Sequence, residues 1–202
     1  MRVTYERTFN NRLINTSEEK NYGCIEEILE DIYNCFEVML KKHSKVFVLR
    51  FDIRFPKDTI FYDKNKIYDF NYNLKRILNR EKIQGGHRVD PLLISVAEKH
   101  NEDHNHYHYL LLVNGNAHHN SINILEKINR LWSRMIGSNQ KGLVDFCYKH
   151  GRNGIMLDKN SYDFEKQYNE AFYQASYLAK IRGKQNPDKG SWLVKKSRYS
   201  HY

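Results

Sequence analysis

Two neighbouring apolar segments, Leu92 to Glu98 and His106 to Val113, constrain the fold of this chain most strongly. The polar stretch KHNEDHN separates them, and this pattern is typical of a β-hairpin with an exposed connection. We therefore expect the two segments to pair at the centre of an antiparallel sheet.

Alternation and helical spacing predict the remaining elements. From Val46 to Phe55 apolar residues occupy every second position, with Arg50 and Arg54 on the other face, and Pro56 ends this strand. Short strands are predicted at 143–148 and 155–157, and helices at 25–40, 66–82, 121–136 and 162–181, whereas residues 1–20 are polar and aperiodic. This order predicts an α+β fold in which helices flank one central antiparallel β-sheet.

The composition favours a single domain that binds a polyanion. The 202 residues suffice for one core, and 33 Lys and Arg against 24 Asp and Glu give a net charge of +9. The 15 Tyr and 10 Phe offer faces on which unpaired bases can stack, although most of these rings must belong to the core. Nucleic acid is therefore the leading partner, and an ordinary basic protein is the alternative.

The cysteines and the hydropathy pattern favour a cytoplasmic protein. Cys24, Cys35 and Cys147 are widely spaced and form no CxxC pair, which argues against a disulfide framework and a structural zinc site. No apolar run is long enough to span a bilayer, and the N-terminus lacks the apolar core of a signal peptide. We expect a cytoplasmic location in a bacterial host cell, with no membrane partner.

The segment DHNHYHYLLLV contains the densest chemical signal. His104, His106 and His108 alternate with other residues, so their side chains leave the same face of a strand, where they could hold a divalent ion. Glu98, across the hairpin, is expected close to His104 or His106 and could supply a carboxylate. Two imidazoles and one carboxylate leave coordination positions open, which is typical of catalysis. The alternative is a polar hairpin end with solvated histidines.

The last predicted helix contains a possible nucleophile. Tyr173, Tyr177 and Lys180 lie along one helical stripe, and a phenol with a pKa near 10 needs a nearby cation and a metal-polarised phosphate to attack. Tyrosines at this spacing are also common in cores. Here the packing could instead come from small and apolar neighbours, namely Ala171, Phe172, Ala175, Leu178 and Ala179.

Together these motifs resemble those of the HUH endonucleases, which carry two histidines flanking a hydrophobic residue, here His106-Tyr107-His108. The Tyr-x-x-Lys motif of that superfamily is matched by Tyr177-Leu178-Ala179-Lys180, and Tyr173 resembles the extra tyrosine of two-tyrosine initiators of small single-stranded DNA phages. The chain looks most like the replication proteins of inovirus-like phages and prophages. FVLRFDIRFP has a counterpart in an early strand motif, and the resemblance spans residues 46–180.

The resemblance implies a ferredoxin-like or RRM-like sandwich that initiates rolling-circle replication. His106, His108 and Glu98 would hold Mg²⁺ or Mn²⁺, with His104 as a competitor for the third position. Tyr177 would form a 5′ phosphotyrosine, and Tyr173 would attack the regenerated origin. The expected organisation is an N-terminal helical extension at 1–44, a catalytic core at 45–182 and a basic tail at 183–202.

The resemblance also implies partners. These are single-stranded or hairpin DNA at a replication origin and a host helicase, because the chain has no nucleotide-binding GKS or GKT loop. A monomer or weak dimer is expected. Arg182 and Lys184 are candidate DNA contacts in the basic stretch that follows Lys180, which could equally be a solvated tail. Arg50 and Arg54 are alternative phosphate contacts if their strand face is exposed.

Four other functions stay open at this point. A transposase or a relaxase would use the same cleavage chemistry. A hydrolytic metal nuclease would use His104 as a base that activates water. A non-catalytic DNA-binding regulatory protein would retain a decayed site.

Overall fold

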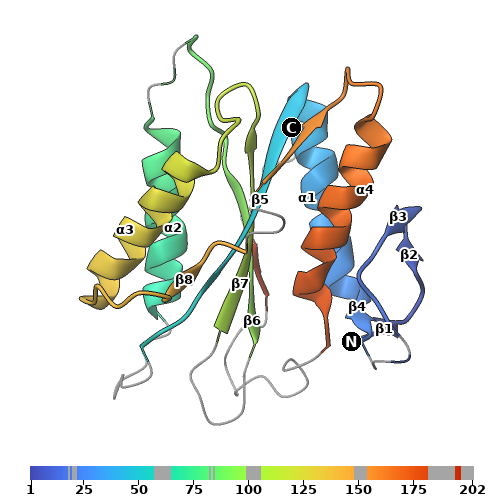
Figure 1. The fold of residues 1–202 in the computed structure, drawn as a ribbon, viewed down its shortest axis with the longest axis horizontal. Helices are drawn as coiled ribbons and strands as arrows, with labels where there is room; N and C mark the ends of the chain where they lie inside the picture. The colour runs from blue at the N-terminus through green and yellow to red at the C-terminus, as the bar shows by residue number, and fades with distance from the viewer. Residues whose placement is uncertain are drawn as a thin grey trace.

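A central antiparallel sheet with helices on both faces forms the fold, as Figure 1 shows for this computed structural model. The structure describes residues 1–17, 19, 22–56, 65–81, 83, 85–98, 106–147 and 154–181, and the backbone of 194–196. The expected α+β class, with helices flanking one antiparallel sheet, is confirmed.

The predicted hairpin forms the middle of this sheet. It pairs β6 (Leu92–Glu98) with β7 (His106–Asn114), and β5 (Lys45–Ile53) pairs with the other side of β7. The path through the main sheet is β10-β6-β7-β5-β8, with β9 also pairing with β5. The strands outside the central β6, β7 and β5 are β8 (Val144–Asp145), β9 (Ile155–Asp158) and β10 (Val194–Lys196).

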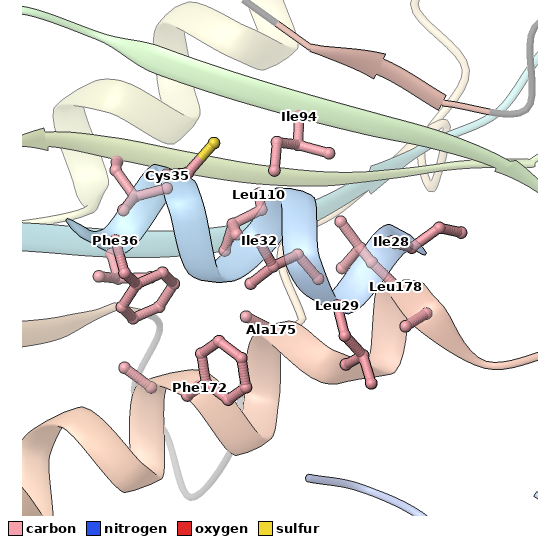
Figure 2. Close-up of a cluster of buried hydrophobic side chains, with 14 of the residues drawn as sticks. Ile28, Leu29, Ile32, Cys35, Phe36, Ile94, Leu110, Phe172, Ala175 and Leu178 are labelled. Atoms are coloured by element: carbon pink, nitrogen blue, oxygen red, sulfur yellow. The ribbon is translucent and has the colours of Figure 1, made fainter. Parts of the chain in front are cut away.

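Alternation along the strands divides their side chains between two cores, because successive residues of a strand point to opposite faces of the sheet. On one face, α1 (Glu26–Lys42) and α4 (Phe164–Ala175) cover the even-numbered apolar residues of β5, β6 and β7. Figure 2 shows this core, where Ile32 and Phe36 of α1 lie between Ile94 and Leu110 of the sheet and Phe172 of α4.

The opposite face is covered by α2 (Asn65–Asn79) and α3 (Ile122–Ile136). Its centre is aromatic: Phe51 of β5 stacks on Tyr109 of β7 with ring centroids 4.7 Å apart, and Phe70 and Trp132 meet edge to face at 5.6 Å. Both faces of β5 are therefore covered over most of its length. Among the described residues, no helix combines the length and apolar character needed to cross a bilayer.

The N-terminal part differs from the expected helical extension at 1–44. The structure places small strands there, namely β1 (Val3–Thr4), β2 (Thr8–Phe9), β3 (Arg12–Leu13) and β4 (Cys24–Ile25). The helix that follows, α1, buries Ile28, Ile32 and Phe36 against the sheet, so it belongs to the main core. These strands are too short to show a period-two pattern in the sequence.

Two predictions about the C-terminal part also need correction. The helix predicted at 162–181 ends at Ala175 and continues as a 3-10 turn, η1 (Ser176–Ala179). The Ser176 hydroxyl donates to the Tyr173 carbonyl at 2.8 Å, a local bond that competes with α-helical bonding. Within the expected tail at 183–202, the backbone of 194–196 pairs with β6 as the edge strand β10; the rest of that tail lies outside the described residues.

Candidate active site

Polar side chains replace apolar ones at the same end of three adjacent strands, on the face covered by α1 and α4. Along β5, Val46 and Val48 give way to Arg50 and Asp52; along β6, Ile94 and Val96 give way to Glu98; along β7, Leu112 and Leu110 give way to His108 and His106. The antiparallel register sets His108 opposite Asp52 and His106 opposite Glu98. The three strands thus bring these four side chains into one cluster.

The His108 imidazole lies between two carboxylates. Its Nε2 atom is 2.6 Å from Oε2 of Glu98, and its Nδ1 atom is 2.8 Å from Oδ1 of Asp52. His108 is 4% exposed and Glu98 9%, so both contacts are largely withdrawn from water. Since buried charge interactions are weakly screened, this pair of contacts fixes the orientation of the ring.

Asp52 was not recognised as a site residue from the sequence. Burial alone would raise the pKa of its carboxyl, but the hydrogen bond and charge of His108, together with the charge of Arg50, outweigh burial and lower that pKa. Asp52 is therefore an anion at neutral pH. The sequence did place Asp52 on the same strand face as Arg50 and Arg54, through the period-two alternation of that strand. It did not show that this strand pairs with the histidine strand.

His106 is the second imidazole of the cluster. Its ring centroid lies 6.5 Å from that of His108, and the ring is half-buried. Burial, with the charges of Arg54 and His108, lowers the pKa of His106 despite the opposing effect of Asp52 and Glu98. The neutral ring offers a nitrogen lone pair, which is the form that binds metal ions.

Tyr177 approaches this cluster from η1. Its ring centroid lies 5.4 Å from that of His108 at an interplanar angle of 80°, and Cζ of Arg50 lies 3.9 Å above the phenol ring. Nζ of Lys180 is 4.7 Å from the Tyr177 ring and 4.6 Å from the ring of Tyr22. Two cations therefore lie close to the aromatic ring that contacts His108. Tyr22 lies between the aperiodic residues 1–20 and the helix predicted from residue 25, where the sequence gave no signal.

The phenol of Tyr177 is protonated in the free protein at neutral pH. Burial raises its pKa, the charge of Arg50 opposes this rise, and the charges of Glu98 and Asp52 raise the pKa further. The cation expected beside Tyr177 from the sequence was Lys180. The cation that lowers this pKa in the structure is Arg50, and its effect is smaller than that of burial.

Cys147 completes the Asp52 side of the cluster. Burial, aided by the charge of Asp52, raises the pKa of this thiol to about 12, so the thiol stays protonated and can donate a hydrogen bond to Asp52. Its backbone lies at a φ of 47°, which few residues other than glycine adopt. In this environment Cys147 does not react as a thiolate at neutral pH.

The cluster combines carboxylate oxygens, which suit Mg²⁺ and Mn²⁺, with imidazole nitrogens, which are more typical ligands of Zn²⁺ or Fe²⁺. In this structure Nε2 of His108 and Oε2 of Glu98, which are two of the candidate ligand atoms, contact each other directly. Within the described ranges, no three His, Cys, Asp or Glu side chains are grouped so as to hold a metal ion. Glu98 is within reach of His108, whereas its expected competitor His104 lies outside the described residues.

The arginine positions predicted as DNA contacts fall into two groups. Arg50 was a possible phosphate contact if its strand face were exposed, but its side chain is 20% exposed and lies between the Tyr177 ring and Asp52, because η1 covers this end of β5. Arg54 is half-buried beside His106 and its carbonyl accepts a hydrogen bond from Trp132 Nε1 at 3.0 Å. Arg182 and Lys184 lie outside the described residues.

Tyr173 lies one turn before Tyr177 and is 37% exposed. Its ring lines a hollow that is otherwise formed by the N-terminal segment. Ala171, Phe172 and Ala175 of α4 and Leu178 and Ala179 of η1 are all buried, as the sequence suggested.

One comparison with known proteins finds a relationship. The model of the family described as the YagK/YfjJ C-terminal domain matches residues 4–191, which include every described residue of the candidate site. No curated protein and no solved structure matches the chain.

Proposed function

We propose that this chain, which belongs to the YagK/YfjJ C-terminal domain family, nicks and rejoins single-stranded DNA through Tyr177, in the manner of the HUH endonucleases. The observation that carries the proposal is the meeting of Tyr177 with His108, whose rings lie 5.4 Å apart although they come from η1 and β7. A phenol on one element beside imidazoles and carboxylates on another is the minimum that tyrosine transesterification requires.

The proposed reaction conserves the number of phosphorus–oxygen bonds. The phenol oxygen of Tyr177 attacks a backbone phosphorus, and the bond from phosphorus to the 3′ oxygen breaks. The phenol proton ends, in net terms, on the departing 3′ oxygen. The products are a 5′ phosphotyrosine and a free 3′ hydroxyl, and attack by that hydroxyl reverses the step and rejoins the strand.

The side chains around Tyr177 would carry separate parts of this reaction. Arg50 and Lys180 lie against the phenol ring and would offset the negative charge of the phosphate. His106, His108 and Glu98 would hold a divalent ion, which when bound supplies Lewis-acid polarisation of the phosphate. Asp52 contacts the ring nitrogen of His108 opposite Glu98 and would fix the imidazole in one orientation.

The biological process proposed for this reaction is the start of rolling-circle replication of a phage, prophage or plasmid. The substrate would be single-stranded or hairpin DNA at the origin, and a host helicase would unwind the duplex. The net charge of +9 favours binding of such a polyanion. A transposase or a relaxase would use the same bond chemistry and differ in the DNA sequence that it cleaves.

A non-catalytic DNA-binding protein is the second candidate. It is favoured by the placement of His108, since both ring nitrogens contact carboxylates, and by the raised pKa of Tyr177. Such a protein would bind single-stranded DNA and leave it uncut.

One experiment separates these functions. The full chain is incubated with Mn²⁺ and 3′-end-labelled single-stranded DNA from the intergenic regions beside its gene, and the products are resolved on a denaturing gel. A labelled protein–DNA adduct that disappears in Tyr177→Phe supports the proposal. Metal-dependent cleavage without an adduct indicates hydrolysis, and binding without cleavage indicates a regulatory protein; either result would overturn the proposal.

A further inference from the structure

The two helical layers that cover the sheet differ in charge. Figure 1 shows α2 and α3 on one side of the sheet and α1 and α4 on the other. Together α2 and α3 carry six Lys and Arg against two Asp and Glu, whereas α1 and α4 carry three Lys and Arg against seven Asp and Glu. The layer formed by α2 and α3 is therefore the one that attracts a polyanion.

A hollow of about 490 Å³ lies on the outer surface of α3, within this basic layer. Five of its lining residues belong to α3 and are three or four positions apart or adjacent, so they form one stripe along the helix. The sixth follows the helix. The lining consists of Glu126, Asn129, Arg130, Ser133, Arg134 and Asn139. All of them are exposed except Ser133, which is half-buried.

Arg130 and Arg134 are the cations of this hollow. They are four residues apart on α3, so their side chains are neighbours, with roughly 5 to 6 Å between Cβ atoms. Within the part of the chain that the structure describes, neither guanidinium has an acidic partner. Both groups can therefore bind an anion without first breaking an ion pair.

The chemistry of the lining suits the phosphate backbone of duplex DNA. Guanidinium, amide and hydroxyl groups are among the side-chain groups that contact DNA phosphates, and Asn129, Ser133 and Asn139 accompany the two arginines. Among the described residues that line the hollow none is aromatic, so the hollow offers no ring on which an unpaired base could stack. Glu126 is the single acid of the lining, and its charge opposes phosphate binding at that end of the stripe.

The hollow and the candidate active site are connected through β8. Asn139 lines the hollow, and four residues later the Leu143 carbonyl accepts a hydrogen bond from the Arg54 amide at 2.9 Å. The chain then enters β8, where Asp145 pairs with Asp52, and α3 itself packs against β8. The hollow is therefore joined to the site by a short segment, although the two lie on opposite faces of the sheet.

We propose that Arg130 and Arg134 of α3 bind the phosphate backbone of duplex DNA, as a contact separate from the strand that Tyr177 would cleave. The inference rests on the proposed function for the identity of the polyanion as DNA. Tyr177 approaches the sheet from the face covered by α1 and α4, whereas α3 covers the other face. The arginines would therefore hold a double-stranded stem or flank of the substrate while a single strand occupies the active site.

The test is the equilibrium binding of a fluorescein-labelled DNA duplex of mixed sequence, followed by anisotropy at several salt concentrations. Affinity for B-DNA scales with the salt concentration to the power of about −0.9 for each phosphate contacted. Arg130→Gln and Arg134→Gln should therefore each make the slope of log affinity against log salt shallower by about 0.9. At 0.1 M salt this corresponds to roughly 8-fold weaker binding.

Three further variants make the test specific to this hollow. Arg130→Lys should keep the wild-type slope, because the charge remains. Glu126→Gln should tighten duplex binding, because a repelling carboxylate is removed. Lys166→Gln is the matched control: it removes one positive charge from an exposed position of α4, in the acidic layer, and should leave the slope unchanged. Thermal melting would verify that each variant is folded.

Slopes of Arg130→Gln and Arg134→Gln that equal the slope of Lys166→Gln would overturn the inference, as would a wild type that binds no duplex. The proposed function is tested separately, by adduct formation on a short single strand with Mn²⁺, which both arginine variants should perform as the wild type does. Arginine-dependent duplex binding without any adduct would support the role of α3 and refute the nuclease. An adduct with arginine-independent duplex binding would refute only the role of α3.

Discussion

Asp52 and His108 lie directly opposite each other on β5 and β7, with Oδ1 of the aspartate 2.8 Å from Nδ1 of the histidine. Because Nε2 of the same ring faces Glu98, the aspartate determines which nitrogen of His108 is presented to the cluster. Metal-binding histidines commonly have such a carboxylate partner. The cluster therefore has an orienting residue in addition to the candidate ligands.

Asp52→Asn is expected to weaken binding of Mn²⁺ about 10- to 100-fold, since the amide carries no charge to hold the imidazole in one form. Titration calorimetry without DNA measures this effect independently of cleavage. Asp145→Asn is the matched control, because Asp145 pairs with Asp52 in the sheet but is exposed. Equal affinities of the wild type and Asp52→Asn would contradict the orienting role.

His106→Ala should lower both Mn²⁺ affinity and cleavage, because it removes a neutral imidazole from the proposed ligand set. The measurement is the same titration, combined with single-turnover cleavage of single-stranded DNA. His119→Ala provides a control, since His119 is exposed on the segment before α3. An unchanged metal titration would exclude His106 as a ligand.

Arg50→Gln is expected to slow single-turnover cleavage by a factor on the order of 100, because a preorganised positive charge beside the attacked phosphate is lost. Arg50→Lys should recover only part of the rate, since lysine cannot lie flat on the phenol ring as the guanidinium does. Arg76 of α2 lies 5.8 Å from the ring of Tyr72 and offers a control cation–π pair on the other face. A loss of rate in Arg76→Gln as large as that in Arg50→Gln would contradict a local role.

Ser176→Ala tests the attachment of the N-terminal segment to η1. The variant leaves the Asn15 amide without its acceptor and removes the bond to the Tyr173 carbonyl, and such a loss costs about 1 to 3 kcal/mol of unfolding free energy. Denaturant unfolding measures this cost. Ser133→Ala, on α3 and outside the core, should change the unfolding free energy much less. Similar values for the two variants would refute the anchoring role.

The sequence was sufficient to predict the hairpin and the faces of its strands. Period-two alternation and the short polar connection placed Glu98 near the end of the histidine strand, and the register of β6 and β7 sets it opposite His106. Likewise, the small buried residues of α4 were evident from their helical spacing. The periodicity of the sequence therefore predicted the parts of the site that lie on elements adjacent in the chain.

The sequence could not predict contacts between distant segments. Asp52 joins the cluster because β5 pairs with β7 and not with the strand that follows it in the chain. Arg50 lies against the face of the Tyr177 ring because η1 covers that end of β5, and Tyr22 reaches Lys180 from residues that belong to no predicted element. Each of these contacts depends on tertiary packing, which overrides what periodicity alone indicates.

The most direct test of the central claim is to locate the covalent link between protein and DNA. After reaction with single-stranded DNA and Mn²⁺, the adduct is digested with protease and nuclease, and the modified peptide is sequenced by mass spectrometry. We predict a nucleotide on the phenol oxygen of Tyr177, formed equally well by Tyr173→Phe. A first cleavage that places the nucleotide on Tyr173, or strand cleavage that leaves every tyrosine unmodified, would contradict this account.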